Sequence, residues 1–308
     1  MAILFVSDID DPVAWRRELE KRLGPLDFRV WPEIGDAAEI DVALVWRPPR
    51  GLLASLPNLR AILALSAGIE TLLEDRSLPD VPLCRMVDES LVVTMREFVL
   101  AAVLLYHRDL DRYEAQQRRA VWHMRPPRPA SATRVGVMGL GALGRPVAEA
   151  LRDFGFTVRG WSRTPKEIEG VACFAGRGAL AAFAGGCDVL VNLLPLTPET
   201  EGILNAGLFA ALPRGAVVIN VGRGRHLVDA DLIEAVDSGH LRGALLDVFR
   251  EEPLPEDHPF WRRPNIRITP HVAAYTLPES AAEVVAENLR RLSAGRPLLH
   301  VVDRMRGY

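Results

Sequence analysis

A glycine-rich stretch at residues 134–145 constrains the fold of this chain more than any other feature. Val135 to Met138 form a short apolar run typical of a buried strand, which leads directly into a G-x-G-x-x-G motif. The residues that follow, 145–154, have apolar side chains at helical spacing. A strand, a glycine turn and a helix in this order predict a dinucleotide-binding unit. The motif consists of Gly139, Leu140, Gly141, Ala142, Leu143 and Gly144.

The three glycines of the motif have distinct roles in this prediction. Gly139 allows a tight turn, Gly141 lets the backbone approach a pyrophosphate, and Gly144 lets the helix pack closely on the strand. The first N–H groups of the helix and its positive dipole end then face the anion. Because glycines also occur in ordinary turns, a plain structural turn is the alternative. A second strand, expected at residues 156–161, favours the dinucleotide interpretation.

Composition narrows the class of protein. The chain has 308 residues, of which 49% are hydrophobic and 25% charged, and this is enough for two globular domains. Its net charge of −3 gives no electrostatic reason to expect nucleic acid or a membrane as partner. The first apolar run is too short for a signal peptide, and no stretch reaches the length needed to span a membrane. Three scattered cysteines without a C-x-x-C motif predict reduced thiols in the cytoplasm, and we expect no metal site.

The first third of the chain alternates strand and helix patterns. Asp11 and Pro12 are the expected cap and first residue of a helix that reaches about Leu23. This alternation predicts a parallel sheet in a small α/β domain. From Glu89 to about Trp122 the sequence predicts one long helix, and a proline-rich linker at residues 125–133 ends it. The strands of this part are expected at residues 2–6, 28–31, 42–46, 61–65 and 81–85.

The second part repeats the alternation behind the glycine motif, as a doubly wound nucleotide-binding fold does. A helix is expected from Asp229, as its cap, to Ser238, and a last helix at residues 279–294 is expected to return to the first domain. The further strands are expected at residues 156–161, 171–174, 188–193, 216–221, 243–247 and 266–268. The predicted fold is therefore two doubly wound parallel-sheet α/β domains. Residues 1–99, completed by 277–308, form a flavodoxin-like substrate domain, residues 100–276 form a Rossmann-type NAD(P)-binding domain, and the active site is expected in the cleft between them.

Charged side chains follow three strands of the second part. Arg223 stands on a glycine-flanked turn, Asp247 and Glu252 follow the next strand, and His271 follows the last one. Ligands of open parallel sheets bind at the carboxyl ends of strands. Each residue alone has an ordinary interpretation as a surface arginine, a helix cap, a solvated acid or a structural histidine, and the other six histidines keep that interpretation. The four together, behind a dinucleotide motif, favour a catalytic site.

Several segments in a fixed order resemble those of the D-isomer-specific 2-hydroxyacid dehydrogenases, and the likeness covers essentially the whole chain. The glyoxylate/hydroxypyruvate reductase branch is the most similar. Gly222 departs from the pattern because alanine is commoner there, as do Ala274, where glycine is usual, and Glu70, where aspartate is common. The matching segments are residues 137–144, 192–200, 219–224, 246–253 and 269–271.

The resemblance implies roles for individual residues. Arg223, Glu252 and His271 are the implied catalytic set, and Asp247 is expected beside the nicotinamide. The loop at residues 65–69 is similar to the family's loop that holds the substrate carboxylate. The substrate contacts are expected at Trp46, Ala67, Gly68, Arg223 and His271. Further cofactor contacts are expected at Leu194, Pro195, Thr200, Val221, Gly222, His271 and Ala273.

These residue types suit the reduction of a 2-keto acid. The planar guanidinium of Arg223 can bind the carboxylate while it polarises the ketone. The imidazole of His271 titrates near neutral pH and can give the proton that the carbonyl oxygen needs after hydride addition. Glu252 is expected to bond the far ring nitrogen, which fixes the ring and favours its charged form.

The end of the second strand of the nucleotide-binding part predicts which cofactor is preferred. NAD-specific folds place an acid there to bind the ribose 2′-hydroxyl. Here Ser162 and Arg163 stand in that place, and they suit a 2′-phosphate instead. A merely solvated turn formed by Arg163 and Lys166 is the alternative. The sequence therefore predicts NADPH in preference to NADH.

The sequence thus predicts an NADPH-preferring reductase of glyoxylate or hydroxypyruvate that makes D-2-hydroxy acids. The alternatives are a dinucleotide-sensing binding protein on the same scaffold and a D-2-hydroxyacid dehydrogenase for a larger 2-keto acid. A homodimer is expected, because the apolar face of the long helix around Met95–Tyr106 exceeds what one small domain needs. That helix also resembles the family's dimer-contact helix.

Overall fold

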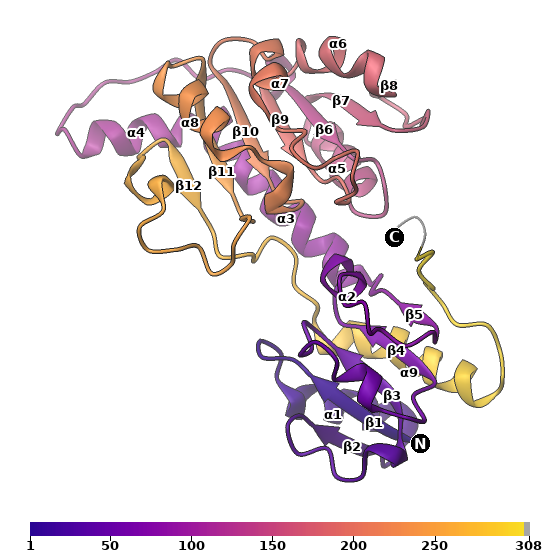
Figure 1. The fold of residues 1–308 in the computed structure, drawn as a ribbon. Coiled ribbons are helices and arrows are strands. Elements are labelled where there is room, and N and C mark those ends of the chain that lie inside the picture. The colour runs from indigo at the N-terminus through magenta and orange to yellow at the C-terminus, as the bar shows by residue number, and fades with distance from the viewer. Residues whose placement is uncertain (305–308) are drawn as a thin grey trace. The chain divides into compact units, whose positions relative to one another are not determined.

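The computed structural model describes residues 1–304, which fold into two compact units (Figure 1). Unit 1 contains Met1–Leu91 and the chain from Thr276 onward, and unit 2 contains Val92–Tyr275. The boundary after Leu91 falls inside helix α3 (Glu89–His107). The sequence-based boundary between residues 99 and 100 falls in the same helix.

Unit 1 is built on a five-stranded parallel sheet with the strand order β2-β1-β3-β4-β5. Its first helix, α1 (Pro12–Leu23), begins as expected, because the Asp11 side chain accepts a hydrogen bond from the Val13 amide. The last helix, α9 (Pro278–Ser293), belongs to this unit, which also holds the short α2 (Glu70–Leu73). The strands are β1 (Ala2–Val6), β2 (Asp27–Val30), β3 (Ile40–Val45), β4 (Ala61–Ala64) and β5 (Leu83–Cys84).

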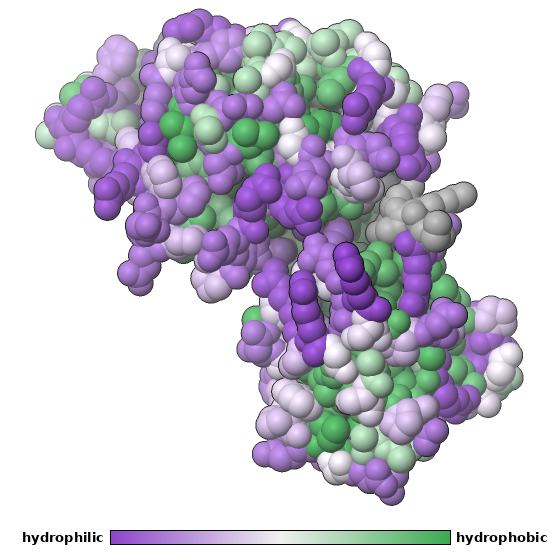
Figure 2. All heavy atoms as spheres, in the orientation of Figure 1, coloured by the Kyte–Doolittle hydropathy of each residue, from purple (hydrophilic) through white to green (hydrophobic). Residues whose placement is uncertain are grey.

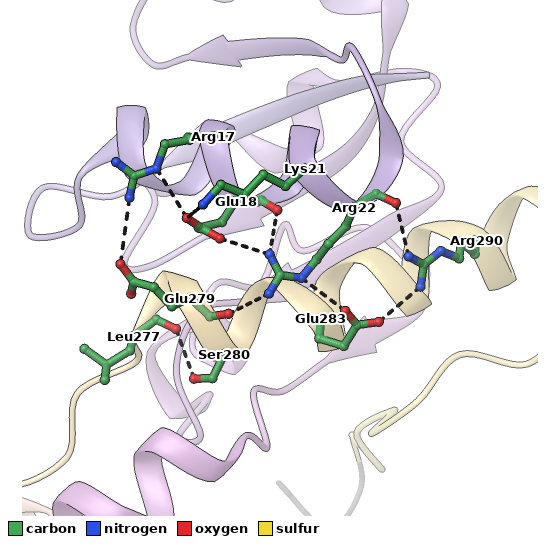
Figure 3. A network of polar contacts seen from close by, with 9 residues as sticks. All are labelled: Arg17, Glu18, Lys21, Arg22, Leu277, Glu279, Ser280, Glu283 and Arg290. Carbon is green, nitrogen blue, oxygen red and sulfur yellow. Dashed lines mark hydrogen bonds and ion pairs between the residues drawn. The ribbon is translucent and has the colours of Figure 1, made fainter.

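A network of ion pairs joins α1 to α9 (Figure 3). Glu18 lies at its centre with a side chain that is 5% exposed, 2.6 Å from Lys21 Nζ and 3.1 Å from Arg22 Nη1. Arg22 also pairs with Glu283 at 3.1 Å. The hydrogen bond from Lys21 and those from Arg22 and Arg17 lower the pKa of Glu18 to about 2. The buried Glu18 carboxylate therefore holds Arg22, and Arg22 in turn joins the first helix of unit 1 to its last one.

Unit 2 is built on a seven-stranded parallel sheet with the strand order β12-β11-β10-β9-β6-β7-β8. From β6 the chain winds first to one side and then, from β9, to the other, so the order reverses between these two strands. This is the predicted doubly wound arrangement, whose ligands bind at the reversal point. The strands are β6 (Arg134–Met138), β7 (Thr157–Ser162), β8 (Val171–Ala175), β9 (Val189–Asn192), β10 (Ala216–Asn220), β11 (Leu241–Leu246) and β12 (Ile266–Ile268).

Both faces of this sheet are buried. Val217 and Ile219 of β10 point into one apolar core, and Val218 between them points into the other. The central strands β9 and β10, which are covered on both faces, are apolar up to their last residue, and this pattern predicts their positions. The first core includes α3 and α5 (Gly144–Phe154), and the second includes α6 (Leu180–Ala184), α7 (Ala206–Ala211) and α8 (Asp229–Asp237).

The prediction of a single long helix over residues 89–122 is wrong, because the structure has two helices there. Helix α3 ends at His107, and α4 (Leu110–Gln117) begins after Asp109, whose φ of 57° lies in the left-handed region. Arg242 of β11 explains the break, since its guanidinium pairs with the carboxylates of Asp109 and Asp111. These ion pairs hold the start of α4 against the first residues of β11.

The apolar face of α3 forms part of the core of unit 2. Val99 and Val103 are fully buried, and Met95, Ala102 and Tyr106 are nearly so. The argument that this face exceeds the needs of one domain is therefore wrong. By length and composition alone, α3 could also cross a membrane, because its mean hydropathy is 1.5. The prediction that no stretch is long enough to do so is therefore wrong. Its burial against the sheet is that of a core helix.

The expected cap of α8 is also corrected. Asp229 is the first residue of the helix, and Val228 occupies the cap position without a side-chain hydrogen bond. The Asp229 carboxylate lies 3.4 Å from His258 Nε2 instead. Burial raises the pKa of Asp229, while the charge and hydrogen bond of His258 oppose that rise.

Candidate active site

The glycine motif forms the turn between β6 and α5, and its glycines are sterically required. Gly139 has a φ of 95°, and a Cβ there would lie 2.7 Å from the Leu193 carbonyl oxygen. A Cβ on Gly144 would lie 1.7 Å from the Gly139 oxygen, so helix and turn are in direct contact. Gly141 has open space where its Cβ would be. A tight turn, a close helix and an accessible backbone between them match the expected roles of the three glycines.

The start of α5 fits a pyrophosphate. Within residues 1–304, no side chain caps this helix: the cap position is Leu143, which makes no side-chain hydrogen bond. The first amide groups of a helix have no partner within the helix, and they attract anions together with the helix dipole. The turn that carries Leu140, Ala142 and Leu143 is thus chemically suited to hold a dinucleotide.

The end of β7 carries the residues expected near a 2′-phosphate. Ser162 is buried and its hydroxyl donates to the Thr164 carbonyl oxygen at 2.8 Å, while Arg163 is exposed. Arg177 of η4 (Arg177–Ala179), which sequence analysis did not single out, donates to the Glu199 carbonyl oxygen at 3.0 Å. A hydrogen bond from Thr197 lowers the pKa of Glu199, and the charges of Arg163 and Arg177 lower it further. The guanidinium groups of Arg163 and Arg177 therefore both exert their positive charge on the Glu199 carboxylate.

The loop after β9 carries Leu194, Pro195 and Thr200, which were expected to contact the cofactor. The Thr200 hydroxyl donates to the Pro195 carbonyl oxygen at 2.8 Å and closes the loop on itself. Leu194 is buried, and its amide donates to the Asn192 side chain at 3.3 Å. Because β9 adjoins β6, this loop lies beside the glycine turn at the reversal point of the sheet.

Arg223 follows β10 on the turn that leads into η5 (Gly224–His226). Its Nη1 atom donates to the Gly222 carbonyl oxygen at 2.7 Å. A Cβ on Gly224 would lie 1.8 Å from the backbone carbon of Phe249, so this turn touches the loop after β11. Glycine at 224 thereby places Arg223 beside the loop that carries Glu252.

Glu252 and His271 form a hydrogen-bonded pair. His271 Nδ1 lies 2.8 Å from Glu252 Oε2, and Glu252 Oε1 accepts a hydrogen bond from the Phe249 amide at 3.0 Å. His271 has a φ of 56°, which is uncommon outside glycine and costs conformational energy. The imidazole side chain is 36% exposed, whereas the carboxylate is 17% exposed. Both the ring orientation and the ring accessibility therefore suit proton transfer to a bound ligand.

Asp247, at the end of β11, holds the loop that carries His271. Its Oδ1 atom accepts hydrogen bonds from the Thr269 hydroxyl at 2.6 Å and the Val272 amide at 2.9 Å, and Oδ2 accepts one from the Ala273 amide at 2.9 Å. The His271 amide donates to the Asp247 carbonyl oxygen at 2.8 Å. Asp247 is only 1% exposed, so this carboxylate is first of all an anchor for the loop. A contact with the nicotinamide remains a prediction.

The residues expected to bind substrate in unit 1 follow neighbouring strands of its sheet. Trp46 follows β3, with the guanidinium of Arg47 4.5 Å from the centre of its ring. Ala67 and Gly68 lie in the loop after β4, which the Ser66 hydroxyl closes by donating to the Gly68 carbonyl oxygen at 2.6 Å. Both loops lie at the carboxyl edge of that parallel sheet.

A set of buried polar residues in unit 2 was missed as functional by sequence analysis. Asn192, Asn220 and His226 are fully buried and form one hydrogen-bonded group beneath Arg223. The available signal was an asparagine at the end of each of two buried strands, β9 and β10. Within residues 1–304, no three histidine, cysteine or acidic side chains gather as a metal site would require.

Comparison with known proteins agrees with this geometry. The family description "D-isomer specific 2-hydroxyacid dehydrogenase, NAD binding domain" matches residues 100–273. A glyoxylate/hydroxypyruvate reductase A from Yersinia enterocolitica is 45% identical, with all of both chains covered. A D-isomer specific 2-hydroxyacid dehydrogenase from Xanthobacter autotrophicus has been solved in complex with NADPH and MES. It is 46% identical with a TM-score of 0.95, and the match covers 100% of this chain and 99% of the other.

A third similar protein is the NADPH-dependent glyoxylate/hydroxypyruvate reductase from Sinorhizobium meliloti, solved in complex with NADP and sulfate. It is 39% identical with a TM-score of 0.93, and the match covers all of both chains. The predicted resemblance is thereby confirmed over the full length. With its glycine turn, its Arg223 turn and its Glu252–His271 pair, this chain belongs to the D-isomer specific 2-hydroxyacid dehydrogenases, a family of NAD(P)-dependent oxidoreductases.

Proposed function

We propose that this protein reduces small 2-keto acids, glyoxylate and hydroxypyruvate, to D-2-hydroxy acids with NADPH. The observation that carries the proposal is the Glu252–His271 pair at 2.8 Å, held on a loop beside the Arg223 turn and on the same sheet edge as the glycine turn. The relatives from Yersinia enterocolitica and Sinorhizobium meliloti carry the name of this reaction.

The three residues divide the work of the reaction. The nicotinamide supplies a hydride to the carbonyl carbon. Arg223 binds the carboxylate of the keto acid and polarises its carbonyl, because a guanidinium presents donors in a planar fork. His271 gives a proton to the carbonyl oxygen from Nε2, while Glu252 accepts the hydrogen bond from Nδ1 and thereby fixes the ring. The substrate side chain contacts Trp46, and the backbone at Ala67 and Gly68 holds the carboxylate.

The cofactor preference is part of the proposal. Ser162 and Arg163 replace the acid that would repel a 2′-phosphate, and Arg177 adds a second guanidinium nearby. Two similar proteins were solved with NADPH or NADP bound. Val221, Gly222 and Ala273 are proposed to line the nicotinamide side of the site.

One experiment tests the reaction and the cofactor together. NADPH or NADH absorbance is followed with glyoxylate, hydroxypyruvate, pyruvate and a larger 2-keto acid. We expect turnover with the first two and a higher kcat/KM with NADPH. No turnover with any keto acid, together with tight NADPH binding, would identify a dinucleotide sensor. Preference for the larger acid would identify a different dehydrogenase of the same family.

A homodimer is proposed on a different basis from the apolar face of α3. The arm that consists of α4 and residues 118–129 exposes Val121, Trp122 and Met124 to solvent, and Trp122 is 102% exposed. Hydrophobic residues are visible among hydrophilic ones at the end of unit 2 where Figure 1 places α4 (Figure 2). Exposed apolar groups of this size are typical of interaction sites. We further propose a cytoplasmic location, because within residues 1–304 the three cysteines form no disulfide.

A further inference from the structure

The buried ring of His226 lies directly beneath the turn that carries Arg223. His226 is fully buried at the end of η5. Its Nδ1 atom lies 2.9 Å from Asn192 Nδ2 and 3.1 Å from the Arg223 amide nitrogen. Its Nε2 atom lies 3.2 Å from the Pro195 carbonyl oxygen. One imidazole therefore bonds both the Arg223 turn and the loop after β9.

These partners determine which ring nitrogen carries the proton. The two groups that face Nδ1, an amide NH₂ and a backbone N–H, are both donors, so Nδ1 must accept and carries no proton. Nε2 faces a carbonyl oxygen, so it must donate. The neutral ring with its proton on Nε2 is the form that satisfies all three contacts. A proton on Nδ1 would place that atom against two donors in a fully buried site, where unsatisfied groups are costly.

Asn220 completes the support of the same turn. Its Oδ1 atom accepts hydrogen bonds from the Gly222 amide at 3.2 Å and from Asn192 Nδ2 at 2.9 Å, and its Nδ2 atom donates to the Arg223 carbonyl oxygen at 3.1 Å. Side chains thus bond the amide of residue 222 and both polar backbone groups of Arg223. The backbone from which the guanidinium projects is determined by buried hydrogen bonds.

Glycine at position 222 permits this arrangement. A Cβ there would lie 2.8 Å from Asn192 Nδ2, 3.1 Å from His226 Nδ1 and 3.2 Å from the Leu194 carbonyl oxygen. The first distance is shorter than real Cβ contacts, so the asparagine would have to move. Glycine at 222, where alanine is commoner in the family, is therefore explained by the close approach of the His226 imidazole and the Asn192 side-chain amide.

We propose that His226 is a positioning residue for Arg223: its neutral ring, accommodated by Gly222, sets the backbone from which the guanidinium reaches the keto acid. The inference rests on the proposed function, because it assigns Arg223 to the substrate. A displacement of about 1 Å in a reacting constellation can cost on the order of 100-fold in rate. His226 itself transfers no proton to substrate, since protein groups occupy both of its ring nitrogens.

The decisive comparison uses two substitutions of the same residue. His226→Leu removes all three ring contacts, and we expect a roughly 10- to 100-fold loss in kcat/KM for hydroxypyruvate. The Kd of NADPH, measured by fluorescence titration, should stay within about threefold, because Thr200 still holds the Pro195 oxygen. His226→Asn restores an acceptor near the position of Nδ1 and should recover most of the lost activity. Equal activity of the Leu variant and the wild type, or an Asn variant as poor as Leu, would overturn the proposal.

A control variant separates this effect from the loss of any histidine hydrogen bond to a backbone carbonyl. His240 Nε2 lies 2.7 Å from the Phe209 carbonyl oxygen. His240 directly precedes β11, at the amino edge of the parallel sheet, whereas the catalytic residues follow the carboxyl ends of its strands. His240→Leu removes a comparable bond to a carbonyl and should leave kcat/KM unchanged. If it lowers kcat/KM as much as His226→Leu does, the effect is general destabilisation and the proposal fails. Gly222→Ala provides the steric counterpart, and it should lower kcat/KM for hydroxypyruvate even if the Leu variant does not fold. An unchanged kcat/KM in Gly222→Ala would contradict the proposal.

The tautomer can be tested without turnover. In protein labelled with ¹⁵N-histidine, the Nδ1 signal of His226 should be that of an unprotonated ring nitrogen and the Nε2 signal that of a protonated one. Assignment follows from the signals lost in His226→Asn. The reverse pattern would overturn the inference regardless of activity. A wild-type protein that reduces no keto acid but shows the expected tautomer would instead refute the proposed function alone.

Discussion

The Asp247→Asn variant should lower the stability of unit 2 even in the absence of cofactor, because the Asp247 carboxylate anchors the loop that carries His271. The carboxylate accepts three hydrogen bonds while 1% exposed. An asparagine oxygen can keep the two bonds from Thr269 and Val272, but its NH₂ then faces the Ala273 amide, donor against donor. Ala273 is itself 2% exposed, so that amide has no access to water.

The magnitude follows from these contacts. Leaving one buried donor unsatisfied costs about 1–3 kcal/mol, and two bonds lose their charge assistance, for a total of about 3 kcal/mol. For a unit of this size the melting temperature should fall by roughly 6–12 °C. Thr269→Val is the matched control, because it removes a single hydrogen bond to the same carboxylate and should cost about 1–2 kcal/mol.

The assay is thermal unfolding of the protein without cofactor, with hydrogen exchange of the amides at Val272 and Ala273. We expect the Asn variant to melt earlier and both amides to exchange faster than in the wild type. If the Asn variant melted with the wild type, kept its amide protection and lost only NADPH affinity, Asp247 would be a cofactor contact and the anchoring argument would be refuted.

Four further predictions address separate parts of the chain. His271→Ala should lower kcat by about 10²- to 10⁴-fold in steady-state assays, the usual scale for a lost general acid, and near-normal turnover would contradict its role. Arg163→Ala should raise the KM for NADPH strongly and leave that for NADH nearly unchanged, whereas equal losses would contradict 2′-phosphate recognition. Glu18 has a lowered pKa, so the stability that it contributes is present above its usual pKa of 4.5 and is lost as the pH falls toward about 2. In acid-denaturation curves, the difference in stability between the wild type and Glu18→Gln should therefore vanish over that range, and a constant difference would contradict this. Trp122→Ser should shift sedimentation from dimer toward monomer, and an unchanged dimer would exclude the arm as its interface.

The sequence predicted the parts of the fold that depend on local patterns. The central strands β9 and β10 are apolar up to their last residue because both faces of the sheet are covered there, and the glycine turn stands directly between a strand and a helix. The break after α3 was not predictable in this way. It depends on Arg242, which lies 131 residues from Asp111, and no local pattern reveals such an ion pair.

The site residues that the sequence predicts are also those with a local signal. Arg223, Glu252 and His271 stand at strand ends, where position alone suggests function. His226 was given an ordinary structural interpretation, since its ring partners Asn192 and Pro195 lie 34 and 31 residues away. Its position beneath Arg223 becomes visible only when strands β9 and β10 lie side by side.

The two histidines at this sheet edge show how the surroundings of a side chain decide its role. His271 is 36% exposed, and Glu252 holds one of its ring nitrogens, so the ring is oriented and a ligand can approach it. His226 is fully buried, and protein groups bond both of its nitrogens, so a proton on Nδ1 would break two contacts. Chemically identical rings therefore divide into a proton donor and a fixed support. The second can serve the reaction only through the arginine that it holds in place.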